Sequence, residues 1–241
     1  MDNKYRIKQD DLCGRLDFSK YEFVDLYGAD LSKVTYLKGA KKTDMAFAKG
    51  LNGCLDFRET DDLNMYWTDC KDVKQLYVNS SASCINISKI ENLYCSLNLG
   101  SVKRILANNA DFSGADVVFN SNADILDLFG AVGLKGDLYF HKVKQLDLGY
   151  SDLSKVNNIK FNPYAIMINL AGTRGLKGTL DFGYAKLVGL RNADLSKVYK
   201  IVCGQNTTLN HLTDKHAIEV IRLPMTNIQT QVVSQQLVKS K

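Results

Sequence analysis

Gly136-Asp137-Leu138-Tyr139-Phe140 is one of four copies of a five-residue motif that recurs along the chain. The other three copies are Gly14-Arg15-Leu16-Asp17-Phe18, Gly53-Cys54-Leu55-Asp56-Phe57 and Gly178-Thr179-Leu180-Asp181-Phe182. Cys95-Ser96-Leu97-Asn98-Leu99 is a degenerate fifth copy, and the first residues of successive copies are 39, 42, 41 and 42 positions apart. A period of this length indicates a repeat protein.

A second marker keeps the same spacing. Five aspartates stand in an Ala-Asp-Leu-Ser-Lys-Val context or its variants, again at steps of 39, 42, 41 and 42: Asp30, Asp69, Asp111, Asp152 and Asp194. Each unit of about 41 residues divides once more, because residues 146–161 align with residues 168–182. The elementary coil therefore has 20 or 21 residues, and the chain holds about ten coils in five units.

Short L-x-L and I-x-F triplets within each coil alternate apolar and polar residues, which is the pattern of a strand with one buried face. One coil cannot bury its own apolar face, so neighbouring coils stack. The sequence thus predicts a mainly β, right-handed repeat solenoid over residues 12–212. Residues 1–11 are expected to form an N-terminal cap or arm, and residues 213–241 a C-terminal cap or tail. One column of leucines is expected to point inward: Leu16, Leu55, Leu97, Leu138 and Leu180.

The C-terminal tail has a different pattern. Ile228, Val232, Val233 and Leu237 are spaced so that they would line one side of a short helix after Pro224. We expect this helix to cap the last coil, and a partner-binding helix is the alternative.

Residues 143–161, VKQLDLGYSDLSKVNNIKF, resemble the leucine-rich repeat pattern L-x-x-L-x-L-x-x-N-x-L, with Ser151 or Asp152 near the usual place of the asparagine ladder. The resemblance extends over about residues 12–212. Residues 109–117 also resemble the A-D-L-x-x rhythm of the pentapeptide repeats. A flattened, mostly parallel β-solenoid agrees with both. The leucine-rich-repeat resemblance implies recognition of a partner through one strand face.

Composition narrows the functional classes. The 241 residues are 45% hydrophobic and 24% charged, and the net charge of +5 is too small to indicate a nucleic-acid binder. The polar N-terminus, MDNKYRIKQDDLCG, lacks a secretion signal, and no window is apolar enough to span a membrane. The expected location is the cytoplasm, or a host cell reached without a classical signal peptide. The six cysteines form no CxxC pair, which favours reduced, mostly buried thiols and no metal.

Catalytic motifs are missing from the sequence. There are three histidines and no P-loop, G-x-S-x-G or H-E-x-x-H spacing, so neither an enzyme nor a cofactor is expected. The alternative is a β-helical enzyme that acts on polysaccharide. Aspartates recur at equivalent positions of the triplets, and a pair of carboxylates is what a glycoside hydrolase uses to cleave its substrate. Those aspartates are Asp17, Asp25, Asp56, Asp147 and Asp181. We favour a different explanation for them, a solvated polar ladder that the repeat itself produces.

A surface for a partner is predicted on the outer face of the L-x-F triplets. Their middle residues, coil by coil, are Asp17, Lys38, Asp56, Tyr77, Asn98, Phe119, Tyr139, Lys160, Asp181 and Val202. Tyr77, Phe119 and Tyr139 form a central aromatic patch in this series, bounded by Lys38 and Lys160, and such a patch is typical of a protein-binding site. We therefore expect a non-enzymatic, protein-binding solenoid, of the kind used as an effector or inhibitor by a microbe or phage. Oligomers through the solenoid ends or the aromatic face are left open.

The other outward face is predicted to be a hydrated Asn/Asp surface. Its residues are Asp25, Ala46, Asn64, Asn86, Leu106, Asp127, Asp147, Asn169, Gly189 and His211. The five aspartates of the second marker are expected to hold the corners by accepting backbone N–H bonds. Lys33, Lys155 and Lys197 occupy the same position of the 41-residue unit and would form a basic row along the solenoid. The other two units have Asp72 and Gly114 at this position. The row is therefore interrupted, and phosphate binding is not expected.

Overall fold

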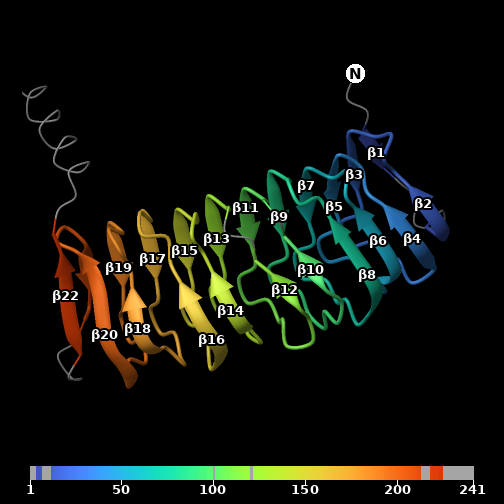
Figure 1. Ribbon diagram of the computed structural model, residues 1–241. Coiled ribbons are helices and arrows are strands. Elements are labelled where there is room, and N and C mark those ends of the chain that lie inside the picture. The colour runs from blue at the N-terminus through green and yellow to red at the C-terminus, as the bar shows by residue number, and fades with distance from the viewer. Residues whose placement is uncertain (1–3, 7–11, 100, 120–121, 213–217, 225–241) are drawn as a thin grey trace, which may run out of the picture.

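The repeat builds the predicted architecture. The computed structural model describes residues 4–6, 12–99, 101–119, 122–212 and 218–224. These residues contain strands and turns but no helix, and the strands stack as a β-solenoid of about ten coils (Figure 1). Adjacent strands all run parallel, because each strand pairs with the equivalent strand of the next coil.

One side of the solenoid is a single sheet of 11 strands, called here the long sheet. Its strands are β1 (Lys4–Arg6), β3 (Phe23–Asp25), β5 (Lys42–Asp44), β7 (Asp62–Asn64), β9 (Cys84–Asn86), β11 (Arg104–Leu106), β13 (Ile125–Asp127), β15 (Gln145–Asp147), β17 (Met167–Asn169), β19 (Leu187–Gly189) and β21 (Thr208–Asn210). Each strand is a triplet, and from β3 to β19 its middle residue is buried in the core.

The opposite side, called here the divided face, consists of four separate sheets. The first contains β2 (Gly14–Asp17), β4 (Val34–Lys38), β6 (Asn52–Phe57) and β8 (Asp72–Val78), and the second contains β10 (Leu97–Asn98) and β12 (Val117–Val118). The third contains β14 (Lys135–Tyr139) and β16 (Lys155–Lys160), and the fourth contains β18 (Lys177–Asp181), β20 (Lys197–Gly204) and β22 (Glu219–Leu223).

The glycine that begins the five-residue motif makes a β-bulge on the divided face. The pairing register shifts directly after Gly14, Gly53, Gly136 and Gly178. All four have φ between 67° and 74°, in the left-handed region that suits glycine. The glycine therefore recurs because four of the five units have such a bulge, whereas β10 and β12 of the unit that begins with Cys95 pair without a register shift.

The leucine that follows in the motif fills the core. Leu55, Leu97, Leu138 and Leu180 are buried as predicted, whereas Leu16 in the first coil is half-buried. The motif's last residue forms a second inward column that includes Phe57, Phe140 and Phe182. Two apolar columns on this side thus face the buried middle residues of the long sheet.

The five corner aspartates act as predicted. In each of them Oδ1 accepts the backbone N–H of the residue two positions later, at 2.8 to 3.1 Å. The acceptors are Asp30, Asp69, Asp111, Asp152 and Asp194. Their repetition is accounted for by the turn that each one holds.

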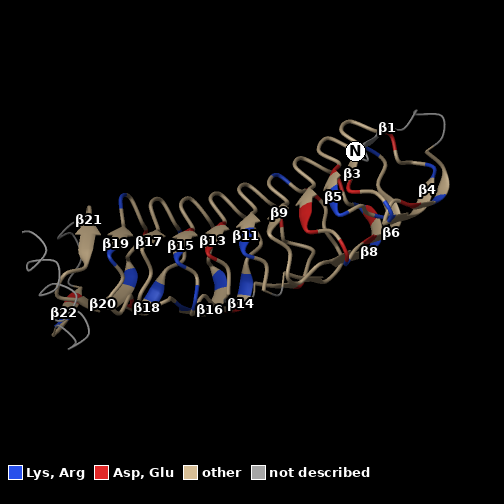
Figure 2. Ribbon diagram, turned by 90° about the horizontal axis from the view of Figure 1, so that it is seen from above, with Lys and Arg blue, Asp and Glu red and all other residues tan. Residues whose placement is uncertain are grey.

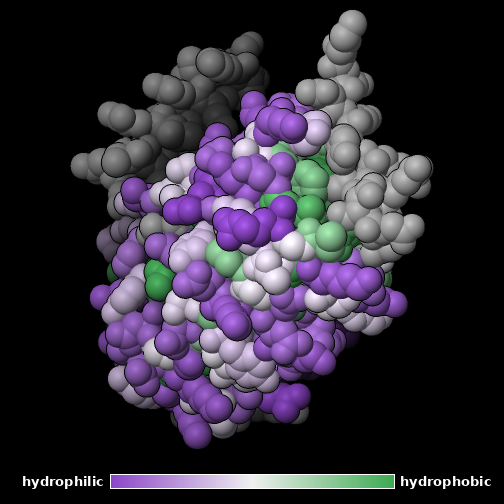
Figure 3. Space-filling view, turned by 90° about the vertical axis from the view of Figure 1, so that its right-hand side faces the viewer, coloured by the Kyte–Doolittle hydropathy of each residue, from purple (hydrophilic) through white to green (hydrophobic). Residues whose placement is uncertain are grey.

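Strands extend beyond residues 12–212 at both ends. β1 pairs with β3 in the long sheet, and β22 pairs with β20 on the divided face. The helix expected from Ile228, Val232, Val233 and Leu237 lies outside the described residues. The view onto the N-terminal end shows a mostly hydrophilic surface with a small hydrophobic area (Figure 3).

The six cysteines are free thiols. Cys70 and Cys203 are buried, Cys13 is exposed, and Cys54, Cys84 and Cys95 are half-buried, so fewer are buried than the sequence predicts. Burial raises the pKa of the Cys70 thiol to about 12, which keeps it protonated and unreactive at neutral pH.

The inward leucine column provides a stability test. Leu97→Ala opens a cavity in a central coil, so we expect the free energy of unfolding to fall by about 2–5 kcal/mol in urea denaturation. The control is Val118→Ala in the next coil, because Val118 is 59% exposed and points outward. We expect that variant to change stability by no more than about 0.5 kcal/mol. Equal losses in both variants would contradict the assignment of inward and outward residues.

Candidate binding surfaces

Two of the three aromatic residues of the predicted patch are exposed, as expected. Tyr77 is 40% exposed and Tyr139 is 41% exposed on the outer side of the divided face. The prediction for Phe119 is wrong, because this side chain is only 8% exposed and packs edge-on against Phe112, with ring centroids 5.4 Å apart. Val118 pairs with Asn98 and takes the outward position instead. This coil is one residue shorter than its neighbours, which shifts the phase.

The structure separates the predicted patch into two surfaces. Lys38, Asp56 and Tyr77 are paired in register in the first sheet of the divided face. Tyr139 pairs with Lys160 in a different sheet. β10 and β12 lie between these two sheets (Figure 1). A partner would have to span several coils to contact both tyrosines.

Asp56 points outward but is buried by its neighbours, at 4% exposure. Arg58 donates to it through Nε at 2.9 Å and Nη2 at 2.7 Å, and the Tyr36 hydroxyl lies at 3.3 Å. These hydrogen bonds, with that from Arg58 as the largest influence, lower the pKa of Asp56 despite its burial. The Arg58 guanidinium also lies 5.0 Å from the centroid of the Tyr77 ring. Asp56 therefore orients the residue that supports Tyr77.

A groove of about 550 Å³ adjoins Tyr77. The groove lies on the divided face between β8, which has seven residues, and the much shorter β10, which has two. Arg58, Cys95, Asn98 and Val118 are among its lining residues, so its walls are of mixed apolar and polar character.

The Asn/Asp face of the long sheet supports the turns. The third residues of the triplets form a column. Where this residue is Asp or Asn, as at Asp44 and Asn64, its side-chain oxygen accepts the backbone N–H two residues later. The amide of Asn64 donates to Asp44 at 3.0 Å, and that of Asn86 donates to Asn64 at 3.0 Å. We call this column the Asx ladder. Many of its side chains are half-buried, so it is a structural element as well as a polar surface.

Two residues were assigned to this column incorrectly. Ala46 is buried at 2% exposure, and Asp44 takes its place. His211 lies in the following turn with φ of 60°, and Asn210 takes its place. Both errors come from placing the triplet one or two residues too late along the chain.

An aromatic cluster that was not among the predicted sites lies in the turns that follow β3, β5 and β7. We define it as Tyr27, Phe47, Tyr66 and Trp67. Phe47 is its centre, with its ring centroid 5.3 Å from those of Tyr27 and Tyr66 and 5.6 Å from that of Trp67. Tyr27 is 62% exposed and Trp67 is 48% exposed. The Lys89 ammonium of the next coil lies 4.4 Å from the Trp67 centroid.

Phe47 and Trp67 occupy backbone that suits glycine. Their φ values are 59° and 54°, and the equivalent turn position of other coils holds either glycine or one of several larger residues, all with positive φ: Gly28, Lys89, Asn109, Gly130, Tyr150, Gly172 and Asn192. Bulky side chains are uncommon in this backbone region, and the turn accepts several residue types there. The turn itself thus gives no reason for these two aromatic residues. The signal was present in the sequence, as aromatic residues two or three places after successive triplets.

The described residues provide no metal or membrane feature. No three or more of their His, Cys, Asp and Glu side chains are grouped so as to hold a metal ion. In the same part of the chain, no helix has the length and apolar character needed to cross a membrane.

Comparison of the chain with protein-family models, with curated proteins and with solved structures finds no match.

The Asp56 carboxylate predicts an acid-sensitive contribution to stability. Its folded-state pKa is lowered, so its contribution is present above the unfolded-state pKa of about 3.9 and is lost as the pH falls through the folded-state value. Arg58 is 66% exposed, and solvent screening therefore limits the effect. We expect Asp56→Asn to destabilise the protein by about 1–2 kcal/mol at pH 7 and by progressively less toward pH 3. Urea denaturation at several pH values measures both.

The matched control is Asp116→Asn, which removes an exposed partner of Lys135. We expect it to change stability by no more than about 0.5 kcal/mol at any of these pH values. A pH profile of Asp56→Asn that runs parallel to that of the wild type would contradict the proposed role of Asp56.

Proposed function

We propose that this protein is a non-enzymatic binding protein whose ligand is another protein, and that it acts as an effector or inhibitor by occupying its target. The observation that carries the proposal is the aromatic cluster, in which Tyr27 and Trp67 are exposed and pack with the half-buried Phe47 and Tyr66. Tryptophan and tyrosine are the residues most enriched at binding hot spots, because they bury a large area with few rotatable bonds.

The geometry of the cluster favours a protein over a flat ligand. The Phe47 ring is tilted by 55° from Tyr27 and by 63° from Tyr66, so the rings form an uneven apolar surface. Such a surface suits the interlocking side chains of a protein interface. Lys89 borders the cluster on one side, and Asp25 and Asp44 of the Asx ladder precede it in their coils. Charged residues around an apolar centre are the usual arrangement of such interfaces.

The strand-face surface of Tyr77 and Lys38, with Tyr139 and Lys160 farther along, is the second contact in this proposal. The leucine-rich-repeat resemblance supports it, since proteins of that family mostly bind partners through one strand face. The Asx ladder favours the same kinship over a pentapeptide repeat, because it holds the coil turns as an asparagine ladder does.

The test compares two double variants with the wild type. Phe47→Gly/Trp67→Gly removes the central rings and places glycine where the backbone already suits it, so folding is expected to be retained. Tyr77→Ser/Tyr139→Ser removes the exposed rings of the strand face. Proteins captured from a host lysate by the wild type are identified by mass spectrometry, and the purified partner is then titrated against each form.

We expect Phe47→Gly/Trp67→Gly to weaken the complex by at least 30-fold, or about 2 kcal/mol, with a melting temperature close to that of the wild type. Trp67 is the single tryptophan of the chain, so its emission in the wild type reports directly whether the partner covers the cluster. A loss confined to Tyr77→Ser/Tyr139→Ser would move the main contact to the strand face. Normal binding by both variants would refute the proposed surface.

A further inference from the structure

The charge of the protein is divided between the two halves of the solenoid. Residues 12–130 contain 13 Lys and Arg against 16 Asp and Glu, a net charge of −3. Residues 131–212 contain 11 Lys and Arg against 5 Asp and Glu, a net charge of +6. Figure 2 shows the basic residues on successive strands of the C-terminal half and most acidic residues toward the other end.

Four lysines stand at the start of the divided-face strands of four successive coils in the C-terminal half. Lys135 pairs with Lys155, and Lys177 pairs with Lys197, each at the start of its strand. β16 and β18 belong to adjacent coils and contact one another, so the four lysines follow coil after coil. All four are exposed. We call this row the lysine ladder. The row can be recognised in the sequence only when adjacent coils are aligned, rather than every second coil.

The fold does not require lysine at these positions. Asn52 and Asp72 hold the equivalent places in the first sheet of the divided face. Lysines about 5 Å apart repel one another, so the row opposes stacking of the coils. Lys135 pairs with Asp116 at 3.0 Å, whereas Lys155, Lys177 and Lys197 form no ion pair with any residue that the structure describes. Three positive charges are therefore available to a ligand.

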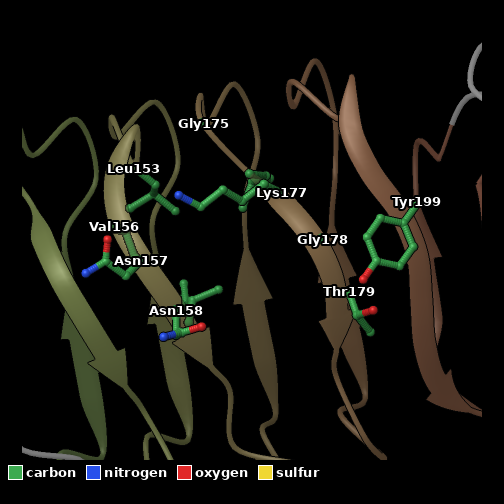
Figure 4. Close-up of a pocket in the computed structure, with 11 residues that line it drawn as sticks. Leu153, Val156, Asn157, Asn158, Gly175, Lys177, Gly178, Thr179 and Tyr199 are labelled. Atoms are coloured by element: carbon green, nitrogen blue, oxygen red, sulfur yellow. The ribbon is translucent and has the colours of Figure 1, made fainter.

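A cleft of about 280 Å³ adjoins the lysine ladder (Figure 4). It lies beside the bulge after Gly178, and Asn157, Lys177, Thr179 and Tyr199 are among its lining residues. Tyr199 is 64% exposed, so one face of its ring is open to a ligand. Amide, hydroxyl and aromatic groups beside a row of cations suit a ligand that has hydroxyls and an apolar ring face as well as negative charge.

We propose that the lysine ladder and its adjoining cleft bind a linear polyuronic acid, with the sugar chain lying along the solenoid axis. Such a chain combines a carboxylate, free hydroxyls and an apolar ring face in every sugar residue, which are the three features that the lysines, the polar cleft residues and Tyr199 complement. Asn157 and Thr179 would hydrogen-bond to sugar hydroxyls, and Tyr199 would stack on a ring face. This surface is separate from the aromatic cluster and does not depend on the proposed protein partner.

Two other polyanions match the ladder less well. The bases of a single-stranded nucleic acid call for several stacking rings, whereas Tyr199 is the one aromatic residue that lines this cleft. An extended acidic peptide of Asp or Glu carries the carboxylates but offers no ring face to Tyr199 and no hydroxyls to Asn157 and Thr179.

The experiment titrates the full chain with polygalacturonate by calorimetry at 0.1 M salt, with dextran as the neutral comparison. We expect the triple variant Lys155→Gln/Lys177→Gln/Lys197→Gln to bind at least tenfold more weakly than the wild type. Lys41→Gln/Lys42→Gln/Lys71→Gln is the matched control, because it removes the same charge from exposed lysines of the N-terminal half. It is expected to bind within twofold of the wild type. Thermal melting checks that both variants fold.

A fourth variant separates sugar recognition from simple attraction between charges. Tyr199→Ala should weaken polygalacturonate binding several-fold and leave any binding of poly-glutamate unchanged. The proposal is overturned if the wild type does not bind polygalacturonate, or if the two triple variants lose equally. Tighter binding of poly-glutamate or of a single-stranded oligonucleotide would likewise show that the ligand class is wrong.

Discussion

Parallel main-chain pairing between each coil and the next is the constraint on which the rest of this structure depends. Because Leu126 pairs with Leu146, and Leu146 with Ile168, every position in the coil becomes a column that runs along the solenoid. A column that points inward has to hold apolar side chains, and a column in a turn has to match that turn. The same residue types therefore recur at the inward and turn positions of each coil, whereas the residues vary at positions that face solvent.

Most of the fold could be predicted from the sequence because its determinants recur. The bulge glycines, the inward leucines and the corner aspartates each appear several times at one spacing, so chance variation in a single coil does not hide them. Phe119 could not be placed in this way, because its coil is one residue shorter and the loss of one residue reverses inside and outside. The lysine ladder was missed for a related reason: it is visible only when adjacent coils are aligned, whereas the clearest markers recur every second coil.

The binding surfaces were less predictable because they lie where the residue at a column position differs from the residue that recurs in other coils. The Asx ladder fixes the turns through side-chain hydrogen bonds, so the turn geometry does not rely on glycine at the left-handed position. That support allows Phe47 and Trp67 to stand there and to meet Tyr27 and Tyr66 across the coils. The Asx ladder and the aromatic cluster are thus linked, because the hydrogen bonds of the ladder offset the backbone strain at the positions of Phe47 and Trp67.

The unequal charge of the two halves gives the rod a permanent electric dipole along its long axis. With an excess of negative charge toward one end and of positive charge toward the other, the molecule experiences a torque in the field of any charged surface. Near an anionic surface its C-terminal half is drawn in first and its N-terminal half is held away. The aromatic cluster, which lies in the acidic half, would then project from that surface, accessible to molecules arriving from solution.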